Sequence, residues 1–322
     1  MSEQHVPSAF ADVSEAELRE KFESVDYVAD DEIVTTVQLA LGLGKPLLVE
    51  GPPGAGKTEL AKVLARTLAT ELVRLQCYEG LAAENVLYEW NYTKQLLAVQ
   101  AGAGDVKRGE SDGGPSSVFS EEYLLERPLL RALRTEGDEP PVLLIDEVDR
   151  ADEEFEALLL EILSDFQVTV PELGSIAASV PPVVVITSNR TRGLSDALKR
   201  RCLYLYIEPP SFEKEQEIVR RKVPSLDRAV ATQVVRAVQR LREEPLRKQP
   251  GVSETLDWAR AVAHRRNDRD GDQELSAEAA RRTLGSLLKE AEDIERVDDA
   301  LLAELLDGDD VTTAPEEGSD AD

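Results

Sequence analysis

The chain has 322 residues, of which 42 % are hydrophobic and 31 % are charged, a balance typical of a folded globular protein. Its 64 acidic residues outnumber the 37 basic ones and give a formal net charge of −27, which disfavours binding to nucleic acid or to an anionic membrane surface. Two cysteines and two histidines are too few for a disulfide framework or a cluster of metal ligands. The N-terminal residues do not resemble a signal peptide and no apolar run could span a membrane, so we expect a cytoplasmic protein.

The first elements that the sequence predicts are two helices. Ser14 and Glu17 have the spacing of a capping box, which indicates a helix that begins just after Ser14. Asp30 or Asp31 could cap a second amphipathic helix, and the glycines at 42 and 44 are expected to end it.

A glycine-rich loop follows the strand expected at Pro46–Glu50. The sequence GPPGAGKT over Gly51–Thr58 fits the phosphate-binding pattern G-x-x-x-x-G-K-[ST], with a strand before it and a helix after it. Its glycines let backbone amides surround phosphate groups, Lys57 adds a cation near the β- and γ-phosphates, and the Thr58 hydroxyl reaches Mg²⁺. The predicted nucleotide-binding residues are Gly51, Pro52, Pro53, Gly54, Ala55, Gly56, Lys57, Thr58 and Glu59.

The segment after this loop contains a second predicted strand, Leu72–Cys77. An aromatic group at Tyr88, Trp90 and Tyr92 could line a partner surface or fill a core. Beyond it we expect a flexible insertion at 101–117, rich in glycine, serine and charge, and then a helix over roughly Glu121–Arg134.

An acidic pair ends the next buried strand. Val142–Glu147 reads VLLIDE, and its Asp146 lies 89 residues after Lys57, so the strand delivers two carboxylates to its carboxyl end. We expect Asp146 to hold Mg²⁺, directly or through water, and Glu147 to orient and polarise the attacking water.

The remaining elements of the first half are a helix at Glu153–Leu163, a β-hairpin over 166–180, and buried strands at Val183–Thr187 and Leu203–Ile207. Asn189 follows the first of these strands, where its amide can contact the γ-phosphate and the attacking water.

A dense cationic run comes next in this acidic chain. At least one of these arginines is expected to reach the γ-phosphate bound by a neighbouring subunit and to stabilise the transition state. The run consists of Arg190, Arg192, Lys199, Arg200 and Arg201.

These patterns predict an α/β fold with a five-stranded parallel sheet flanked by helices, followed by a small all-helical domain. We place the nucleotide-binding domain at 1–209, the helical domain at 210–306 and a disordered acidic tail at 307–322. The α/β domain includes the insertion at 101–117 and the hairpin at 166–180.

Together the two nucleotide motifs, the strand-terminal Asn189, the arginine run and the helical domain resemble an AAA+ ATPase with a helical lid. More narrowly the chain resembles the MoxR family, and QCYEGL (76–81) with LYEWNYTKQLL (87–97) is similar to its CoxD-like branch. The resemblance covers about 25–303 and assigns the arginine finger to Arg201, with Arg200 as second choice.

The chain departs from this family at one point. Members usually carry an arginine of the helical lid in a pattern like GxSPR, but Gly251–Leu256 reads GVSETL, with Glu254 and Thr255 where Pro and Arg would fall. Lid closure must then use another cation, such as Arg260, or be weaker.

The resemblance implies an ATP- and Mg²⁺-dependent ATPase that assembles into a homo-oligomeric ring, of six subunits in this family. It further implies a chaperone-like activator that remodels or matures a protein client, such as a molybdenum metalloenzyme, together with a von Willebrand A domain partner.

Two other functions stay open at this point: a nucleic-acid motor or clamp loader, which the net charge opposes, and a nucleotide-gated binding module with little turnover. The residues do not distinguish ATP from GTP, because contacts to the base would come from the backbone near 27–28 and from the helical domain.

Overall fold

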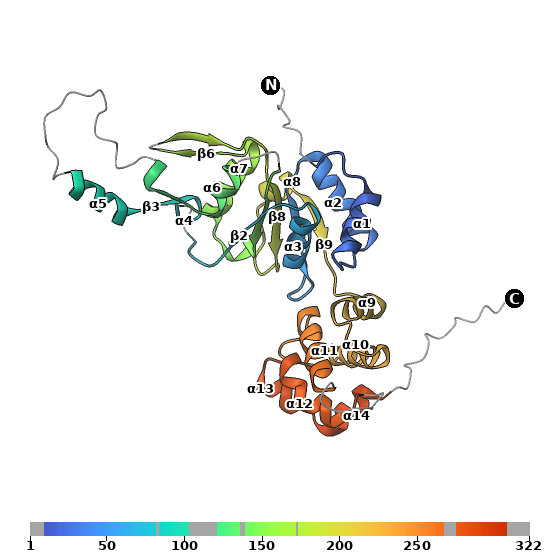
Figure 1. Ribbon diagram of the computed structural model, residues 1–322. Helices are drawn as coiled ribbons and strands as arrows, with labels where there is room; N and C mark the ends of the chain where they lie inside the picture. The colour runs from blue at the N-terminus through green and yellow to red at the C-terminus, as the bar shows by residue number, and fades with distance from the viewer. Residues whose placement is uncertain are drawn as a thin grey trace, which may run out of the picture. The chain divides into compact units, whose positions relative to one another are not determined.

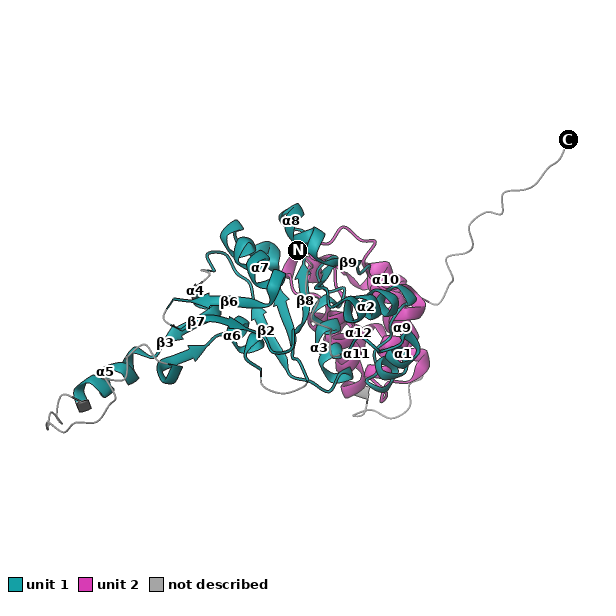
Figure 2. Cartoon of the chain, turned by 90° about the horizontal axis from the view of Figure 1, so that it is seen from above, with its two compact units in different colours: residues 1–208 teal, residues 209–322 magenta. Residues whose placement is uncertain are grey.

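The computed structural model describes residues 10–81, 84–102, 121–135, 139–171, 173–266 and 275–307. The chain divides into two compact units, residues 1–208 and residues 209–322 (Figure 2), and each is described by itself.

A five-stranded sheet forms the centre of the first unit, and every neighbouring pair of its strands is parallel. The order across the sheet is β2-β5-β8-β1-β9. The strands are β1 (Leu47–Glu50), β2 (Leu72–Gln76), β5 (Val142–Asp146), β8 (Val183–Ser188) and β9 (Leu203–Tyr206). Because β1, β5 and β8 are adjacent and parallel, the loops after their carboxyl ends meet at one edge.

Helices cover both faces of this sheet (Figure 1), as the prediction of an α/β fold required. Alternate residues of β1 show why: Leu48 packs with one hydrophobic cluster, while Val49 packs with the other. The first cluster includes α6 (Pro128–Leu133) and α7 (Glu153–Asp165). The second includes α1 (Glu15–Ser24), α2 (Asp31–Leu43) and α3 (Lys57–Thr67).

The ends of the first two helices follow local rules. The Ser14 hydroxyl accepts a hydrogen bond from the Glu17 amide at 3.2 Å, which confirms the predicted cap. Gly44 ends α2 in the left-handed region with φ of 60°, whereas Gly42 lies inside the helix.

The helix expected over Glu121–Arg134 is wrong in its first half. Glu121–Tyr123 forms a short 3-10 helix (η1), and Leu124–Glu126 is a strand, β4, that pairs antiparallel with β3 (Tyr88–Trp90). The helix α6 begins only at Pro128, which suits a first helical position because it has no amide hydrogen to donate.

The segment around β3 contains further elements that the sequence did not predict, α4 (Glu84–Leu87) and α5 (Tyr92–Gly102). The aromatic group divides: Trp90 is buried, whereas Tyr92 on α5 is 67 % exposed. Beyond Gly102, the insertion expected at 101–117 lies outside the described residues.

The expected hairpin is present, with β6 (Gln167–Val170) paired antiparallel to β7 (Gly174–Ala177). Two short elements flank strands of the sheet: η2 (Val148–Arg150) follows the carboxyl end of β5, and α8 (Asp196–Arg201) precedes the amino end of β9.

The second unit is helical throughout its described residues and has its own core around the buried Trp258. Its helices are α9 (Phe212–Lys222), α10 (Arg228–Leu241), α11 (Val252–Arg266), α12 (Ala277–Leu287), α13 (Ala291–Arg296) and α14 (Asp299–Leu306). Of the tail expected at 307–322, only Asp307 is described. Within the described ranges, no helix has both the length and the apolar character needed to cross a bilayer.

Candidate nucleotide-binding site

The glycine-rich loop joins the end of β1 to the start of α3. Gly54 and Gly56 have φ angles of 80° and 97°, which side-chain-bearing residues rarely adopt. Gly51 is required for another reason, since a Cβ there would lie 2.2 Å from the carbonyl oxygen of Ile207. The loop can therefore take this path only with glycine at these positions.

Lys57, the first residue of α3, turns back over the loop. Its Nζ atom donates hydrogen bonds to the carbonyl oxygens of Gly51 and Pro52, both at 2.8 Å. Burial lowers the pKa of the Lys57 ammonium, while the nearby carboxylates of Asp149, Asp146 and Glu147 act in the opposite direction. The cation is thus held inside the curve of the loop, where phosphate oxygens would be its natural partners.

Asp146 ends β5 and is surrounded by donors, with only 3 % of its side chain exposed. Its Oδ1 atom accepts hydrogen bonds from the hydroxyls of Thr58 at 3.0 Å and Thr187 at 2.6 Å. Its Oδ2 atom accepts from the Arg74 guanidinium, at 3.1 Å from Nε and 2.6 Å from Nη2. The structure therefore brings together Thr58 and Asp146, the two residues predicted to hold Mg²⁺.

Glu147 leaves the strand with φ of 56°, in the left-handed region that is uncommon for residues other than glycine. Its Oε1 atom accepts a hydrogen bond from the Asn189 amide nitrogen at 3.3 Å. Its Oε2 atom accepts from Gln76 Nε2 at 3.0 Å and lies 3.0 Å from Arg150 Nε. The carboxylate thus contacts the predicted Asn189 and two residues that the sequence analysis did not assign to the site.

Asp149 anchors the loop that carries Asn189. Its Oδ1 atom accepts from the Asn189 backbone amide at 3.1 Å, and its Oδ2 atom accepts from the Thr191 amide at 2.9 Å and hydroxyl at 2.5 Å. Burial alone would raise the pKa of Asp149, but these hydrogen bonds hold it below its ordinary value. A charged Asp149 therefore fixes the position of Asn189 next to Glu147.

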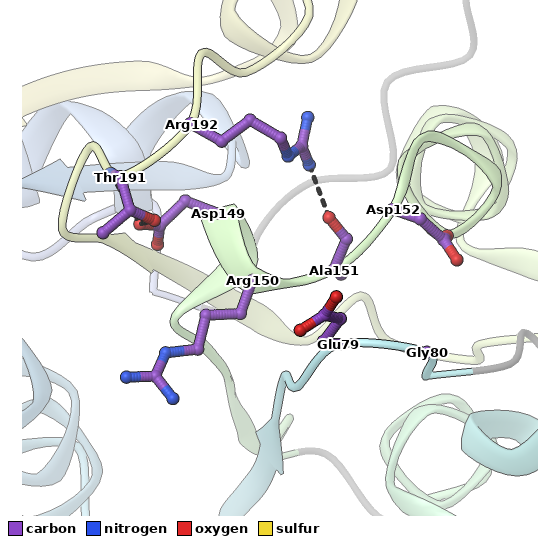
Figure 3. A pocket seen from close by; sticks show the side chains of 8 residues that line it. All are labelled: Glu79, Gly80, Asp149, Arg150, Ala151, Asp152, Thr191 and Arg192. Atoms are coloured by element: carbon purple, nitrogen blue, oxygen red, sulfur yellow. Dashed lines mark hydrogen bonds between the residues drawn. The ribbon is translucent and has the colours of Figure 1, made fainter.

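A pocket lies beside this anchor (Figure 3). Arg192 lies across it and donates from Nη2 to the carbonyl oxygen of Ala151 at 2.8 Å, the dashed line in the figure. The pocket is lined by Glu79, Gly80, Asp149, Arg150, Ala151, Asp152, Thr191 and Arg192.

The two candidate arginine fingers lie apart from these groups. Arg200 and Arg201 are exposed at the end of α8, and Arg201 Nε donates to the Ser164 hydroxyl at 3.2 Å. Among the described residues, neither forms a hydrogen bond or ion pair with Lys57, Asp146 or Glu147.

In the second unit, Thr255 is fully buried at the position where the arginine of the lid pattern would fall. Its hydroxyl donates to Glu215 Oε1 at 2.7 Å, so this position contributes to the core of the unit. Arg260, the other candidate cation, is exposed and lies 3.3 Å from the carboxylate of Asp257.

Sequence reasoning missed Arg74, Gln76, Asp149, Arg150 and Thr187. The signal for the first two was the alternation in β2, whose exposed positions near its carboxyl end are both polar. Recognising their role required the sheet order, which places β2 and β8 on either side of β5.

The residues present fit a Mg²⁺–nucleoside triphosphate. The loop offers backbone amides and Lys57 to phosphate oxygens, while the Thr58 hydroxyl and the Asp146 carboxylate are the hard oxygen donors that Mg²⁺ prefers.

A comparison with protein families matches residues 46–202 to the AAA domain of the dynein-related subfamily. Two similar curated proteins are uncharacterized: SH1500 of Staphylococcus haemolyticus, 27 % identical over 73 % of this chain and 82 % of that protein, and SAB1265c of Staphylococcus aureus, 24 % identical over 73 % and 81 %.

Among solved structures, the RuvB Holliday junction branch migration motor of Thermotoga maritima is similar, with a TM-score of 0.50 and 17 % identity over 88 % of this chain and 75 % of that one. At this identity the likeness shows the fold alone. None of these matches names the MoxR family. Residues 46–202, which contain the phosphate-binding loop and the acidic pair, are therefore similar to AAA domains of the dynein-related subfamily.

Proposed function

We propose that this chain is an ATPase that binds ATP with Mg²⁺ and hydrolyses it. One observation carries the proposal: Lys57, Thr58 and Asp146 converge with Glu147 and Asn189 at the carboxyl ends of three adjacent parallel strands. A binding loop alone would need no carboxylate beside the metal ligands, whereas hydrolysis needs a group that accepts a proton from water.

Each residue then has a chemical role. The amides of 51–56 and the Lys57 ammonium bind phosphate oxygens, while Thr58 and Asp146 would hold Mg²⁺, which when bound neutralises phosphate charge. Glu147 orients the attacking water and takes up its proton. Asn189, whose amide donates to Glu147 Oε1, keeps that carboxylate aimed and senses the γ-phosphate.

The deciding experiment compares Glu147→Gln with the wild-type chain. We expect the variant to bind ATP normally and to hydrolyse it at least a hundredfold more slowly, as is typical when proton transfer is lost. Glu154→Gln, an exposed carboxylate on α7, is the matched control and should retain full turnover. Normal hydrolysis by Glu147→Gln would remove the role assigned to Glu147.

We further propose that the active form is a homo-oligomeric ring of six, with Arg201 supplied by a neighbouring copy and Arg200 as second choice. The exposure of both side chains at the end of α8 supports this role. Turnover per subunit should rise with protein concentration, and Arg201→Ala should keep ATP binding while losing that rise. A verified monomer as active as the assembled form would contradict it.

The work driven by hydrolysis follows only from the MoxR resemblance. We propose a chaperone-like activator that acts on a protein client, such as a molybdenum metalloenzyme, with a von Willebrand A domain partner and the second unit as lid. A nucleotide-dependent pull-down with a neighbouring gene product of that type would test the partnership, and absence of binding in every nucleotide state would argue against it.

One observation favours a second candidate, a nucleotide-gated binding module with little turnover: Thr255 is buried within its own unit and supplies no cation to a phosphate. Single-turnover kinetics separate the two, because a binding module would retain unhydrolysed ATP. A nucleic-acid motor, the function named for the similar RuvB structure, is opposed by the net charge of −27 and would require ATPase stimulation by DNA at low salt.

A further inference from the structure

Arg74 is a cation in direct contact with the carboxylate expected to hold Mg²⁺. It lies on β2, next to β5, where the parallel register sets Gln76 opposite Asp146. Both Nε and Nη2 of Arg74 donate to the same oxygen, Asp146 Oδ2. Nη2 also donates to Gln76 Oε1 at 2.6 Å, which gives the guanidinium a second partner on its own strand.

The other oxygen of Asp146 is also occupied, by the hydroxyls of Thr58 and Thr187. These two contacts involve neutral groups that can rotate away or bond through another lone pair. The guanidinium is different, because it cannot lose its proton and brings a full positive charge to the site. Among the described residues, Arg74 is therefore the one hydrogen-bond partner of the Asp146 carboxylate that repels a divalent cation.

The two side chains of the Arg74–Asp146 ion pair differ in their exposure to solvent. The Asp146 side chain is almost fully buried, whereas about half of the Arg74 side chain is exposed. An exposed guanidinium can swing into solvent at little cost, while the buried carboxylate stays in place. Arg74 can thus neutralise Asp146 when no metal is present and move aside when a metal arrives.

We propose that Arg74 is a positioning residue that competes with Mg²⁺ for Asp146 and thereby weakens the dependence of nucleotide binding on magnesium. The inference rests on the proposed function, since it assumes that this site takes a Mg²⁺–nucleotide. Arg74 would then act as a second cation of the site beside Lys57, one that neutralises Asp146 rather than the phosphates.

Removal of the Arg74 charge should change nucleotide affinity in opposite directions without and with Mg²⁺. Without Mg²⁺, removal of the guanidinium leaves the Asp146 charge facing the triphosphate, and binding weakens. With Mg²⁺, removal of the competing cation frees Asp146 for the metal, and binding strengthens. The ratio of the Kd in EDTA to the Kd in saturating Mg²⁺ must therefore rise when the charge is removed.

The experiment measures this ratio by equilibrium binding of a fluorescent ATP analogue at constant ionic strength. Arg74→Gln removes the charge but keeps an amide donor, and it should raise the ratio on the order of three- to tenfold, as expected for a partly exposed charge pair. Arg74→Lys restores the charge and should return the ratio most of the way to the wild-type value. Arg131→Gln removes a guanidinium from the exposed pair with Glu71, the residue that precedes β2, and should leave the ratio unchanged.

The outcomes separate this inference from the proposed function. A ratio that stays the same or falls in Arg74→Gln, while the wild-type chain binds in a magnesium-dependent way, overturns the competition and leaves the ATPase proposal intact. A wild-type chain that binds no nucleotide under either condition overturns both. If thermal unfolding shows that Arg74→Gln does not fold, Arg74→Met, which also removes the charge, takes its place: it should raise the ratio, and an unchanged ratio contradicts the inference.

Discussion

The hydroxyl of Thr187 joins the two acidic residues at the end of β5. It donates to Asp146 Oδ1 at 2.6 Å and accepts from the backbone amide of Glu147 at 2.9 Å. One buried side chain of β8 thus fixes both the direction of the Asp146 carboxylate and the turn that carries Glu147 out of the strand.

Thr187→Val keeps the shape of this side chain but removes both hydrogen bonds. We expect it to lower the free energy of unfolding by about 1–3 kcal/mol, because a buried donor and acceptor lose their partner. Turnover should fall more than nucleotide affinity, since Glu147 loses its orientation while the loop at 51–56 is untouched. Chemical denaturation and steady-state kinetics check the two effects; Thr187→Ser, which keeps the hydroxyl, is the control and should stay close to wild type in turnover.

Gly51→Ala tests the path of the phosphate-binding loop. The added methyl would lie 2.2 Å from the Ile207 carbonyl oxygen, a backbone atom that cannot rotate away. We expect a loss of more than about 2 kcal/mol in unfolding free energy, as for other strained substitutions, together with loss of nucleotide binding. Gly193→Ala, with open space around the new methyl, should change stability by less than about 0.5 kcal/mol. Equal stability of the two variants would contradict this account of the loop.

Glu215→Ala tests the buried network of the second unit. Glu215 is fully buried and accepts hydrogen bonds from Arg242 Nη1 and Nη2, each at 2.7 Å. Its removal leaves the guanidinium without its counter-charge, so we expect a cost of about 3–5 kcal/mol. Glu278→Ala removes a carboxylate from an exposed pair with Arg282 and should cost less than about 1 kcal/mol. Denaturation of the full chain in a Trp90→Phe background, followed by the fluorescence of Trp258, compares them.

Cys77 should be a poor nucleophile in the folded chain. Burial, with the nearby charge of Asp146, raises the pKa of its thiol from 9.0 to about 12. In a Cys202→Ala background at pH 8, its reaction with a disulfide reagent should be on the order of a thousandfold slower than that of free cysteine, because so little thiolate is present.

The same shift predicts a dependence of stability on pH. Between pH 9 and pH 12 the folded chain holds the Cys77 proton more tightly than the unfolded chain, so the unfolding free energy should decrease as the pH rises through this range. Cys77→Ala should flatten that decrease. In the experiment with the disulfide reagent, a rate close to that of free cysteine at pH 8 would show that the Cys77 thiol is not shielded.

The main fold followed from the sequence because the buried strands are marked by apolar runs next to recognisable loops. Val142–Asp146 and Val183–Ser188 were predicted within one residue at each end. β4 was missed because its partner strand is distant in the sequence: β3 starts at Tyr88, 36 residues before β4 starts at Leu124. No local sequence pattern reveals such a pairing.

The residues of the candidate site also fall into those that the sequence predicts and those that only the fold reveals. Lys57, Thr58, Asp146, Glu147 and Asn189 were predicted from motifs, since each lies at or after the carboxyl end of an apolar strand. Arg74 and Thr187 belong to no motif and lie within strands rather than in the loops that follow them. Their contacts with Asp146 follow only from the order of β2, β5 and β8, which sequence spacing alone does not specify.

β2 lies at one end of the five-stranded sheet, and Arg74 points from it toward Asp146. A substitution there disturbs one neighbouring strand and little of the core. If Arg74 competes with Mg²⁺ as proposed, natural selection can adjust the magnesium requirement of such a site by exchanging this single residue of an edge strand, without altering the loop proposed to bind the phosphates or the carboxylate proposed to activate water.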